Sequence, residues 1–131
     1  MLNMRLLIDT HVLIWLMVGS QKLTKRCIDL LRGEGCELFF SAASLWEVAL
    51  KHERKPDKIP VSAEQMGRYC RECGIRQVAV RFEHALKTCE LEKIHADPFD
   101  RMLVSQALVE GMKLVSHDED VIAYGDAVIA V

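Results

Sequence analysis

The stretch LLIDTHVLIWL, residues 6–16, places a single carboxylate, Asp9, between a short apolar run and a longer one. The first run predicts a buried strand at residues 5–8, and the second predicts a helix at residues 10–18. Asp9 suits the N-cap of that helix, because its side chain can accept hydrogen bonds from free backbone N–H groups. It also borders the core, where an isolated ionised carboxylate is strongly disfavoured. Asp9 therefore needs a partner from another part of the chain.

Short apolar segments alternate with longer amphipathic segments along the rest of the chain. This alternation is typical of an α/β fold in which helices cover both faces of a parallel sheet. Binding sites in such sheets lie beyond the carboxyl ends of the strands. Further strands are predicted at residues 37–40, 77–80, 113–116 and 127–131. Further helices are predicted at residues 25–32, 41–53, 62–74, 83–91, 98–111 and 119–124.

The composition indicates one globular domain over residues 1–131, because half of the residues are apolar. The formal net charge of −2 argues against a large non-specific nucleic-acid binder but leaves local basic patches open. The apolar runs are shorter than the roughly 18 residues that a membrane span needs. Five cysteines without a disulfide spacing, and no secretory leader, favour a reducing cytoplasm.

Asp100 is the most informative acid after Asp9. It would be the third residue of a helix that opens with Pro98, and Asp97 is expected to be only the N-cap of that helix. The helical face below Asp100 is apolar and faces the core, so its carboxylate needs a partner more than a surface acid does. Asp118 follows the strand at residues 113–116, so it is the best site candidate in the acidic run at residues 118–120.

Glu47 is ambiguous from the residues alone. It shares a polar stripe at helical spacing with Ser44, Lys51 and Arg54, which favours a solvated face. Glu47 and Lys51 would then form an ion pair four residues apart, worth a few tenths of a kcal/mol.

Three or four carboxylates from distant parts of the chain are thus expected at one end of a parallel sheet. Like charges placed together repel and raise one another's pKa unless a cation neutralises them. Oxygen ligands without a cysteine or histidine set suit Mg²⁺ or Mn²⁺ better than Zn²⁺. Such an ion polarises a phosphoryl oxygen and activates water. The acids therefore predict metal-assisted hydrolysis of a phosphodiester.

At these residues the chain resembles the PIN-domain family and, within it, the VapC-type ribonuclease toxins of toxin–antitoxin modules. LLIDTHVLIWL resembles the first family motif, with Asp9 as its acid, and SAASLWEVALK resembles the second, with Glu47. HADPFDRMLVSQAL is the most specific stretch, in which Asp100 and not Asp97 is the third acid. LVSHDEDVIAYG resembles the last motif, with Asp118 as the fourth acid. The resemblance covers nearly the whole chain.

The resemblance implies a three-layer α/β/α sandwich around a five-stranded parallel sheet. It implies an endoribonuclease dependent on Mg²⁺ or Mn²⁺, in which the four acids hold the ion and activated water attacks the RNA phosphodiester. Ser116 stands where the family often has threonine, so its hydroxyl is expected to support the acids of the site without binding the ion itself. Asp120 is an open candidate for an accessory acid. A VapB-type antitoxin is the implied partner, and a homodimer is the implied assembly.

RNA contact must come from local positive charge, since phosphate contacts position the nucleic acid. The candidates are Lys51, Arg54, Lys55 and Arg101. The alternative is that they are ordinary solvated charges, and that Arg101 pairs with a neighbouring acid.

Other patterns carry less functional information. Cys70 and Cys73 form a lone CxxC that closes a helix instead of opening one, so packing thiols are favoured over a redox or zinc site. The alternative to an enzyme is a catalytically silent PIN-like module that binds RNA or a partner. Histidines next to the acids at positions 11 and 117 are expected to be neighbours of the site, and those at positions 52, 84 and 95 give no signal.

Overall fold

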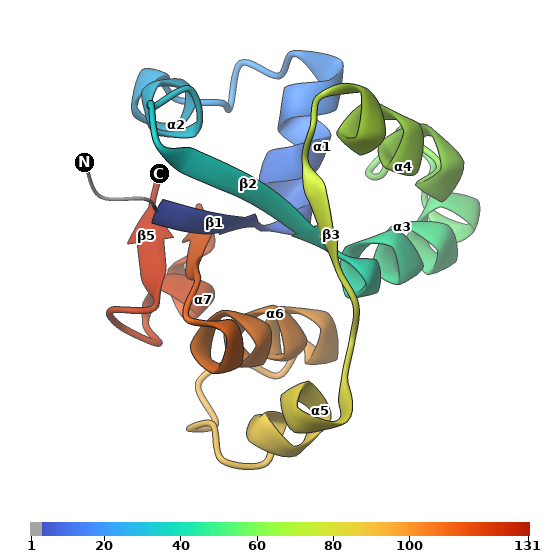
Figure 1. Ribbon diagram of the computed structural model, residues 1–131. Helices are drawn as coiled ribbons and strands as arrows, with labels where there is room; N and C mark the ends of the chain where they lie inside the picture. The colour runs from blue at the N-terminus through green and yellow to red at the C-terminus, as the bar shows by residue number, and fades with distance from the viewer. Residues whose placement is uncertain (1–3) are drawn as a thin grey trace.

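The computed structural model describes residues 4–131, and residues 1–3 of the expected domain lie outside the described part. Within residues 4–131, five parallel strands form one sheet in the order β3-β2-β1-β4-β5 (Figure 1). The strands are β1 (Met4–Ile8), β2 (Cys36–Ser41), β3 (Arg76–Val78), β4 (Lys113–Ser116) and β5 (Val128–Ala130). The helices are α1 (Thr10–Val18), α2 (Lys25–Leu31), α3 (Ala42–Arg54), α4 (Ala63–Glu72), α5 (Phe82–Thr88), α6 (Pro98–Glu110) and α7 (Glu119–Ile122).

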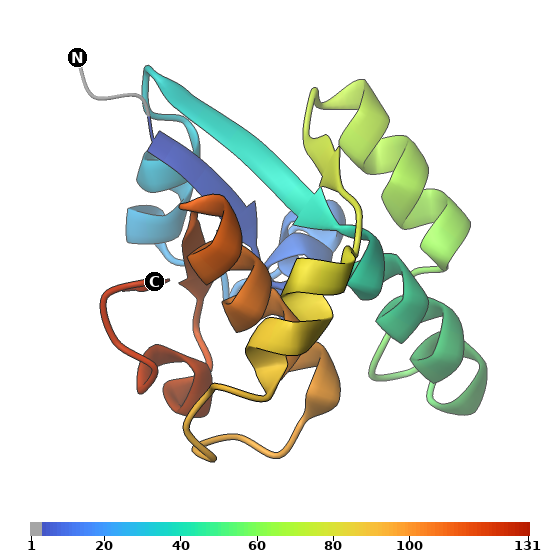
Figure 2. The same cartoon turned by 60° about the horizontal axis from the view of Figure 1, so that its bottom comes forward.

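Helices cover both faces of the sheet, which confirms the expected three-layer α/β/α sandwich. Residues of α1 to α4 form one hydrophobic core against the sheet, and residues of α6 and α7 form a second core on the opposite face. Helix α5 packs against α6, and Figure 2 shows the two helices side by side. The fold therefore has two cores separated by the strands.

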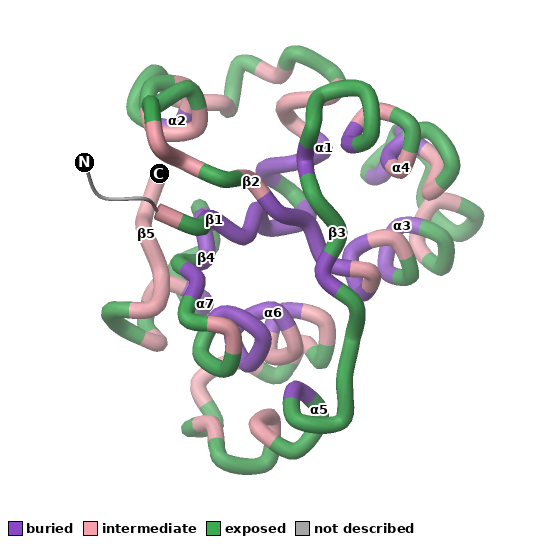
Figure 3. Tube along the Cα trace, in the orientation of Figure 1, coloured by how far each residue is buried: buried purple, intermediate pink, exposed green. Residues whose placement is uncertain are grey.

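The central strand β1 shows why the strands are continuously apolar. Leu6 and Ile8 belong to the first core, Leu7 belongs to the second, and all three are fully buried. Successive side chains of a strand point to opposite faces, so both sets of side chains are buried, and apolar, in a strand that is covered on both faces. Figure 3 shows the same burial through the middle of the sheet.

The elements lie where the sequence predicts them, with differences at their ends. The largest difference is that α5 ends at Thr88 and not at residue 91. The Thr88 carbonyl accepts a hydrogen bond of 2.7 Å from the Arg101 guanidinium, where a longer helix would use a backbone N–H. A side chain distant in sequence thus sets the end of this helix.

The order of the strands fixes where a site can form. The chain runs from β1 outward through β2 to β3, and then crosses to β4 on the other side of β1. The strand order therefore reverses at β1, and the carboxyl ends of β1 and β4 flank the crevice where open α/β sheets bind ligands. Asp9 follows β1 directly, and Asp118 follows β4 by two residues.

Within residues 4–131, no helix combines the length and the apolar character that crossing a membrane requires.

Two leucines of α6 test the second core. Leu103 is 1% exposed and Leu108 is 44% exposed. We expect Leu103→Ala to lower the free energy of unfolding by about 2–5 kcal/mol, because it leaves a cavity in the core. The matched control, Leu108→Ala, should change it by less than about 1 kcal/mol. Urea unfolding followed by circular dichroism measures both, and equal losses would contradict this account of the layers.

Candidate metal centre

A cavity of about 240 Å³ opens at the carboxyl ends of β1 and β4. It contains three of the four predicted acids, brought together from the two strand ends and from α6. Its lining residues are Asp9, His11, Val12, Trp15, Asp100, His117 and Asp118.

Asp9 caps α1 and also reaches the neighbouring strand. It is 3% exposed, and its Oδ1 accepts a hydrogen bond of 3.3 Å from the backbone N–H of His11. Its Oδ2 accepts a hydrogen bond of 2.5 Å from the Ser116 hydroxyl at the end of β4. Within the protein, Asp9 therefore has Ser116 as a partner from another part of the chain, and its carboxylate still lines the cavity.

Ser116 connects two of the acids. Its hydroxyl oxygen accepts a hydrogen bond of 3.1 Å from the backbone N–H of Asp118 while donating to Asp9. Asp118 in turn caps α7, where its Oδ1 accepts from the backbone N–H groups of Asp120 and Val121. The side chain of Asp120 is exposed and does not line the cavity.

Asp100 enters the cavity from the first turn of α6. Asp97 is the N-cap, with its Oδ1 accepting from the backbone N–H groups of Phe99 and Asp100, and Pro98 is the first helical residue, as predicted. Asp100 is 8% exposed although it carries a carboxylate. The cap holds the helix start so that Asp100 faces the strand ends.

Glu47 is the fourth acid, and the interpretation of its stripe as a solvated face is wrong. Glu47 is 1% exposed, because α3 packs against both α1 and α6 at this level. One turn earlier, the Thr10 hydroxyl donates a hydrogen bond of 2.8 Å to the Ser44 hydroxyl, which ties α1 to α3. The predicted pair with Lys51 forms, with 2.5 Å between Nζ and Oε2. Within residues 4–131, the buried Oε1 has no hydrogen-bond partner.

We call Asp9, Glu47, Asp100 and Asp118 the acid cluster. Burial, together with the nearby charges of Asp9, Asp97, Glu47 and Asp118, raises the pKa of Asp100 to about 8. Burial also raises the pKa of Asp9, with Glu47 adding to the effect, although hydrogen bonds from Ser116 and His11 oppose it. The cluster carries more negative charge than its surroundings compensate.

Lys51 is the positive group nearest to the cluster. Burial lowers its pKa, but the hydrogen bond and charge of Glu47, together with Asp97 and Asp100, outweigh burial and raise it. Its Nζ lies 3.7 Å from Asp97 Oδ2, so Lys51 links α3 to the start of α6. Its charge is already shared between two acids.

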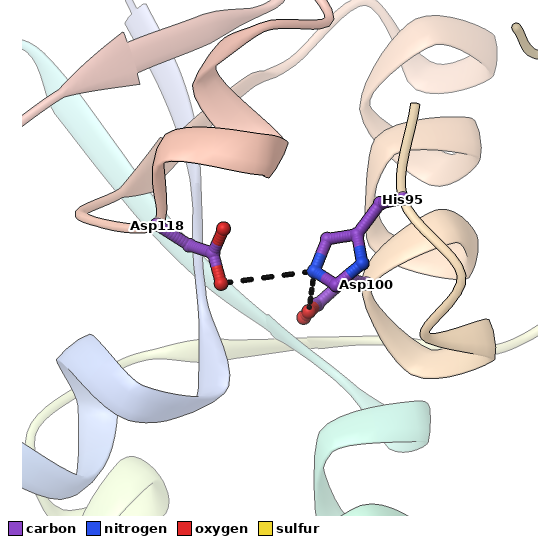
Figure 4. Close-up of side chains that lie close together, drawn as sticks. All are labelled: His95, Asp100 and Asp118. Atoms are coloured by element: carbon purple, nitrogen blue, oxygen red, sulfur yellow. Dashed lines mark ion pairs between the residues drawn. The ribbon is translucent and has the colours of Figure 1, made fainter. Parts of the chain in front are cut away.

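His95 belongs to the site, although its position in the sequence gave no signal. Figure 4 shows its ring between Asp100 and Asp118. Its Nε2 lies 2.9 Å from Asp100 Oδ2 and 3.7 Å from Asp118 Oδ2. Among residues 4–131, one donor atom from each of these three side chains lies within 4.8 Å of the others. The available signal was its place two residues before the N-cap of α6, where the chain folds over the start of the helix.

Arg101 holds the loop that carries His95. Its guanidinium donates to the carbonyls of Thr88, Glu92 and His95 and to the Tyr124 hydroxyl. The alternative expectation, an ion pair with a neighbouring acid, is not what its side chain forms among the described residues. Arg101 therefore has a structural function in this loop.

A second cavity, of about 260 Å³, adjoins the first, and we call it the basic cleft. His11 lines both cavities, so the basic cleft begins at the edge of the acid cluster. Three of the four candidate RNA contacts gather in it. Its lining residues are His11, Lys51, Arg54, Lys55, Lys58 and Ile59.

An apolar patch lies at the starts of α3 and α6. Trp46 is 62% exposed, and its ring makes an edge-to-face contact with Phe99, with 5.3 Å between centroids. Val80 and Met102 complete what we call the apolar patch, around a cavity of about 380 Å³. Large exposed apolar surfaces on a globular domain mark interaction sites.

The cysteines stand apart from the site. Helix α4 ends at Glu72, so Cys70 and Cys73 close a helix as predicted. Cys70 is fully buried and Cys73 is exposed, and both are free thiols.

Comparison with protein families identifies the chain. The model of the PIN domain matches residues 6–127, so the chain belongs to the PIN domain family. No curated protein matches the sequence.

Solved structures share this fold at low sequence identity. VapBC2 from Rickettsia felis, bound to a DNA fragment from its promoter, matches with a TM-score of 0.70 and 12% identity, over 98% of each chain. A toxin–antitoxin complex from Klebsiella pneumoniae matches with a TM-score of 0.64 and 15% identity, over 95% of each chain. VapBC-1 from nontypeable Haemophilus influenzae matches with a TM-score of 0.63 and 17% identity, over 92% of each chain.

The raised pKa of Asp100 predicts how stability depends on pH without metal. Its pKa rises on folding from an ordinary value of 3.8 to about 8, so the folded state binds this proton more tightly than the unfolded state. Stability should therefore fall as the pH rises from about 4 to 8. We expect Asp100→Asn to flatten this fall, measured by thermal unfolding in EDTA.

The control for this experiment is Asp57→Asn, which removes an exposed acid from a loop. It should keep the wild-type dependence on pH. An Asp100→Asn protein that loses stability with rising pH as steeply as the wild type would contradict the assignment.

Proposed function

We propose that the chain is a metal-dependent endoribonuclease of the VapC type, which acts as a single PIN domain over residues 1–131 and hydrolyses RNA phosphodiester bonds. The observation that carries the proposal is the acid cluster, in which four carboxylates from two helices and two strand ends lie at one edge of the sheet. Such crowding of like charges opposes folding unless a cation neutralises them, so it is typical of functional sites. Membership of the PIN domain family supports phosphodiester hydrolysis as well, since the four acids predicted from the sequence motifs are the members of this cluster.

The residues fit a divalent cation. Asp9, Asp100 and Asp118 line one cavity, and the buried Oε1 of Glu47 has no hydrogen-bond partner within residues 4–131. Carboxylate oxygens are the ligands that Mg²⁺ and Mn²⁺ prefer. These four acids would hold the ion, directly or through water. When bound, such a cation supplies electrostatic stabilisation of the phosphoryl group and lowers the pKa of water.

The chain itself orients these groups. Ser116 holds the Asp9 carboxylate by its hydroxyl, and the cap of α7 holds Asp118, so both acids have fixed positions before a ligand arrives. Lys51 holds one oxygen of Glu47 and leaves the other free. Preorganised charges of this kind require little rearrangement during the reaction.

RNA would bind along the basic cleft, with Lys51, Arg54 and Lys55 contacting phosphates on one side of the cut. The shared wall at His11 supports this path, because it places positive charge next to the acid cluster. Arg101 is the weakest of the four candidates, since its guanidinium already donates to three carbonyls and a hydroxyl.

We also propose a VapB-type antitoxin as partner, a homodimer as the assembly and the cytoplasm as the setting. The similar structures from Rickettsia felis and Haemophilus influenzae are VapBC proteins, and that from Klebsiella pneumoniae is a toxin–antitoxin complex. The apolar patch supports a protein interface at the starts of α3 and α6. The five free thiols suit a reducing compartment.

Cleavage of RNA tests the activity. Wild-type protein with Mn²⁺ should cut cellular RNA into discrete fragments, and EDTA should abolish cutting. Asp9→Asn should reduce the rate roughly a hundredfold or more, because the cation loses a ligand worth several kcal/mol in the transition state. Asp57→Asn is the matched control and should cut normally.

Thermal unfolding of the same proteins separates the remaining outcomes. Mn²⁺ should raise the melting temperature of the wild type by linkage, and less so for Asp100→Asn. Equal cutting by wild type and Asp9→Asn would refute the active site. A protein that neither cuts RNA nor responds to Mn²⁺ would instead be the catalytically silent binding module.

The basic cleft makes a kinetic prediction. Replacing Arg54 and Lys55 together by glutamate should raise KM strongly and change kcat little, because these residues contact phosphates away from the reacting atoms. The dependence of KM on salt should also weaken, by roughly one unit of logarithmic slope for each lost phosphate contact. Lys93→Glu, an exposed charge outside the cleft, is the control. A fall in kcat with unchanged KM would argue against the cleft.

The apolar patch predicts where the homodimer forms. Trp46→Glu should convert a dimer into monomers, measured by light scattering after size-exclusion chromatography, because a charge would be buried in the interface. Val18→Glu changes another exposed apolar side chain, at the end of α1, and should leave the dimer intact. A dimer that survives Trp46→Glu would place the interface elsewhere.

A further inference from the structure

The acid cluster contains one group that could either bind a cation or support the acids that do. The imidazole of His95 lies between Asp100 and Asp118, with donor atoms close enough for all three side chains to share one ion (Figure 4). Histidine nitrogen as a ligand would favour later transition metals, whereas carboxylates alone favour Mg²⁺ and Mn²⁺. Whether this ring binds the ion therefore decides which metal ions the site prefers.

The hydrogen bond at the other ring nitrogen distinguishes the two roles. The backbone N–H of Asp97 donates to His95 Nδ1 over 3.2 Å. An acceptor at Nδ1 requires a lone pair there, so the proton of the neutral ring is on Nε2. A histidine that ligates through Nε2 carries its proton on Nδ1 and donates it to an acceptor. The N–H group of Asp97 offers no such acceptor.

The surroundings of His95 hold this arrangement in place. The backbone N–H of His95 donates to the Tyr124 hydroxyl over 3.1 Å, and Arg101 donates to both the His95 carbonyl and the same hydroxyl. Asp97 is fixed as the N-cap of α6. The ring cannot present Nε2 without a proton unless the start of the helix or this loop rearranges.

We propose that His95 is a positioning residue whose Nε2–H donates a hydrogen bond to the Asp100 carboxylate, so that carboxylates and not the imidazole bind the cation. Nε2 lies 2.9 Å from Asp100 Oδ2 but, within residues 4–131, forms no hydrogen bond in the present orientation of the two side chains. A modest rotation of the carboxylate about its soft terminal torsion completes the bond. The proposal rests on the proposed function for its cation, but not for the state of the ring.

The first test needs no metal. Long-range ¹H–¹⁵N correlation spectra of ¹⁵N-histidine-labelled protein report which ring nitrogen carries the proton, and the His95→Gln variant assigns the signal. We expect a protonated Nε2 and an unprotonated Nδ1 for His95. A proton on Nδ1 overturns the proposal, whether or not the protein binds metal or cuts RNA.

The second test uses Mn²⁺ as the probe. Pulsed electron paramagnetic resonance of the Mn²⁺-loaded wild type should show no directly coordinated histidine nitrogen. A coordinated nitrogen that disappears in His95→Gln overturns the proposal while leaving the proposed metal site intact. Wild-type protein that leaves all Mn²⁺ free overturns the proposed function, and the metal-free spectra still decide the state of His95.

Affinity for Mn²⁺ separates positioning from ligation. His95→Ala should weaken Mn²⁺ binding by about 10- to 100-fold, as loss of a group that orients a ligand does. His95→Gln keeps an N–H donor and should recover part of this loss. His52→Gln is the control, because His52 contacts the Ile59 carbonyl and not an acid. Unchanged affinity in His95→Ala would overturn the proposal.

Discussion

The hydrogen bond from Ser116 to Asp9 is the contact on which the arrangement of the site depends. It joins the end of β4 to the end of β1 across 107 residues of sequence and lies in a fully buried position. The Ser116 hydroxyl also accepts from the backbone of Asp118, so one side chain fixes two acids relative to each other. Because the hydroxyl stabilises the ionised form of Asp9, it partly offsets the burial that favours protonation.

Around this contact, the protein buries carboxylates that lose most of their hydration on folding. Asp9, Glu47 and Asp100 are all at least nine-tenths buried, and the positive charge of Lys51 reaches only part of the set. An arrangement of this kind weakens the isolated fold and favours the binding of a cation. The histidine between Asp100 and Asp118 completes this surface without adding a negative charge, and the loop that carries it is held by Arg101 and Tyr124.

The positions of the two other surfaces follow from α3. Its start borders the apolar patch at Trp46, its buried middle carries Glu47 to the acids, and its last turn carries Arg54 to the basic cleft. One helix of 13 residues thus contributes to an apolar surface, a buried acid and a basic surface. Since a helix repeats every 3.6 residues, side chains that are neighbours in sequence can serve different surfaces.

The sequence by itself determined the alternation of strands and helices, the caps at Asp9 and Asp97, and the choice of Asp100 as a buried acid, because periodicity and capping are local properties. Its motifs also predicted the PIN fold. The tertiary structure decided the rest. Glu47 is buried because α3 packs against α1 and α6. Arg101 donates hydrogen bonds to carbonyls instead of pairing with an acid, because a loop folds over its side chain. His95 entered the site through the same loop, which no local pattern could place, since its conformation depends on contacts with Arg101 and Tyr124.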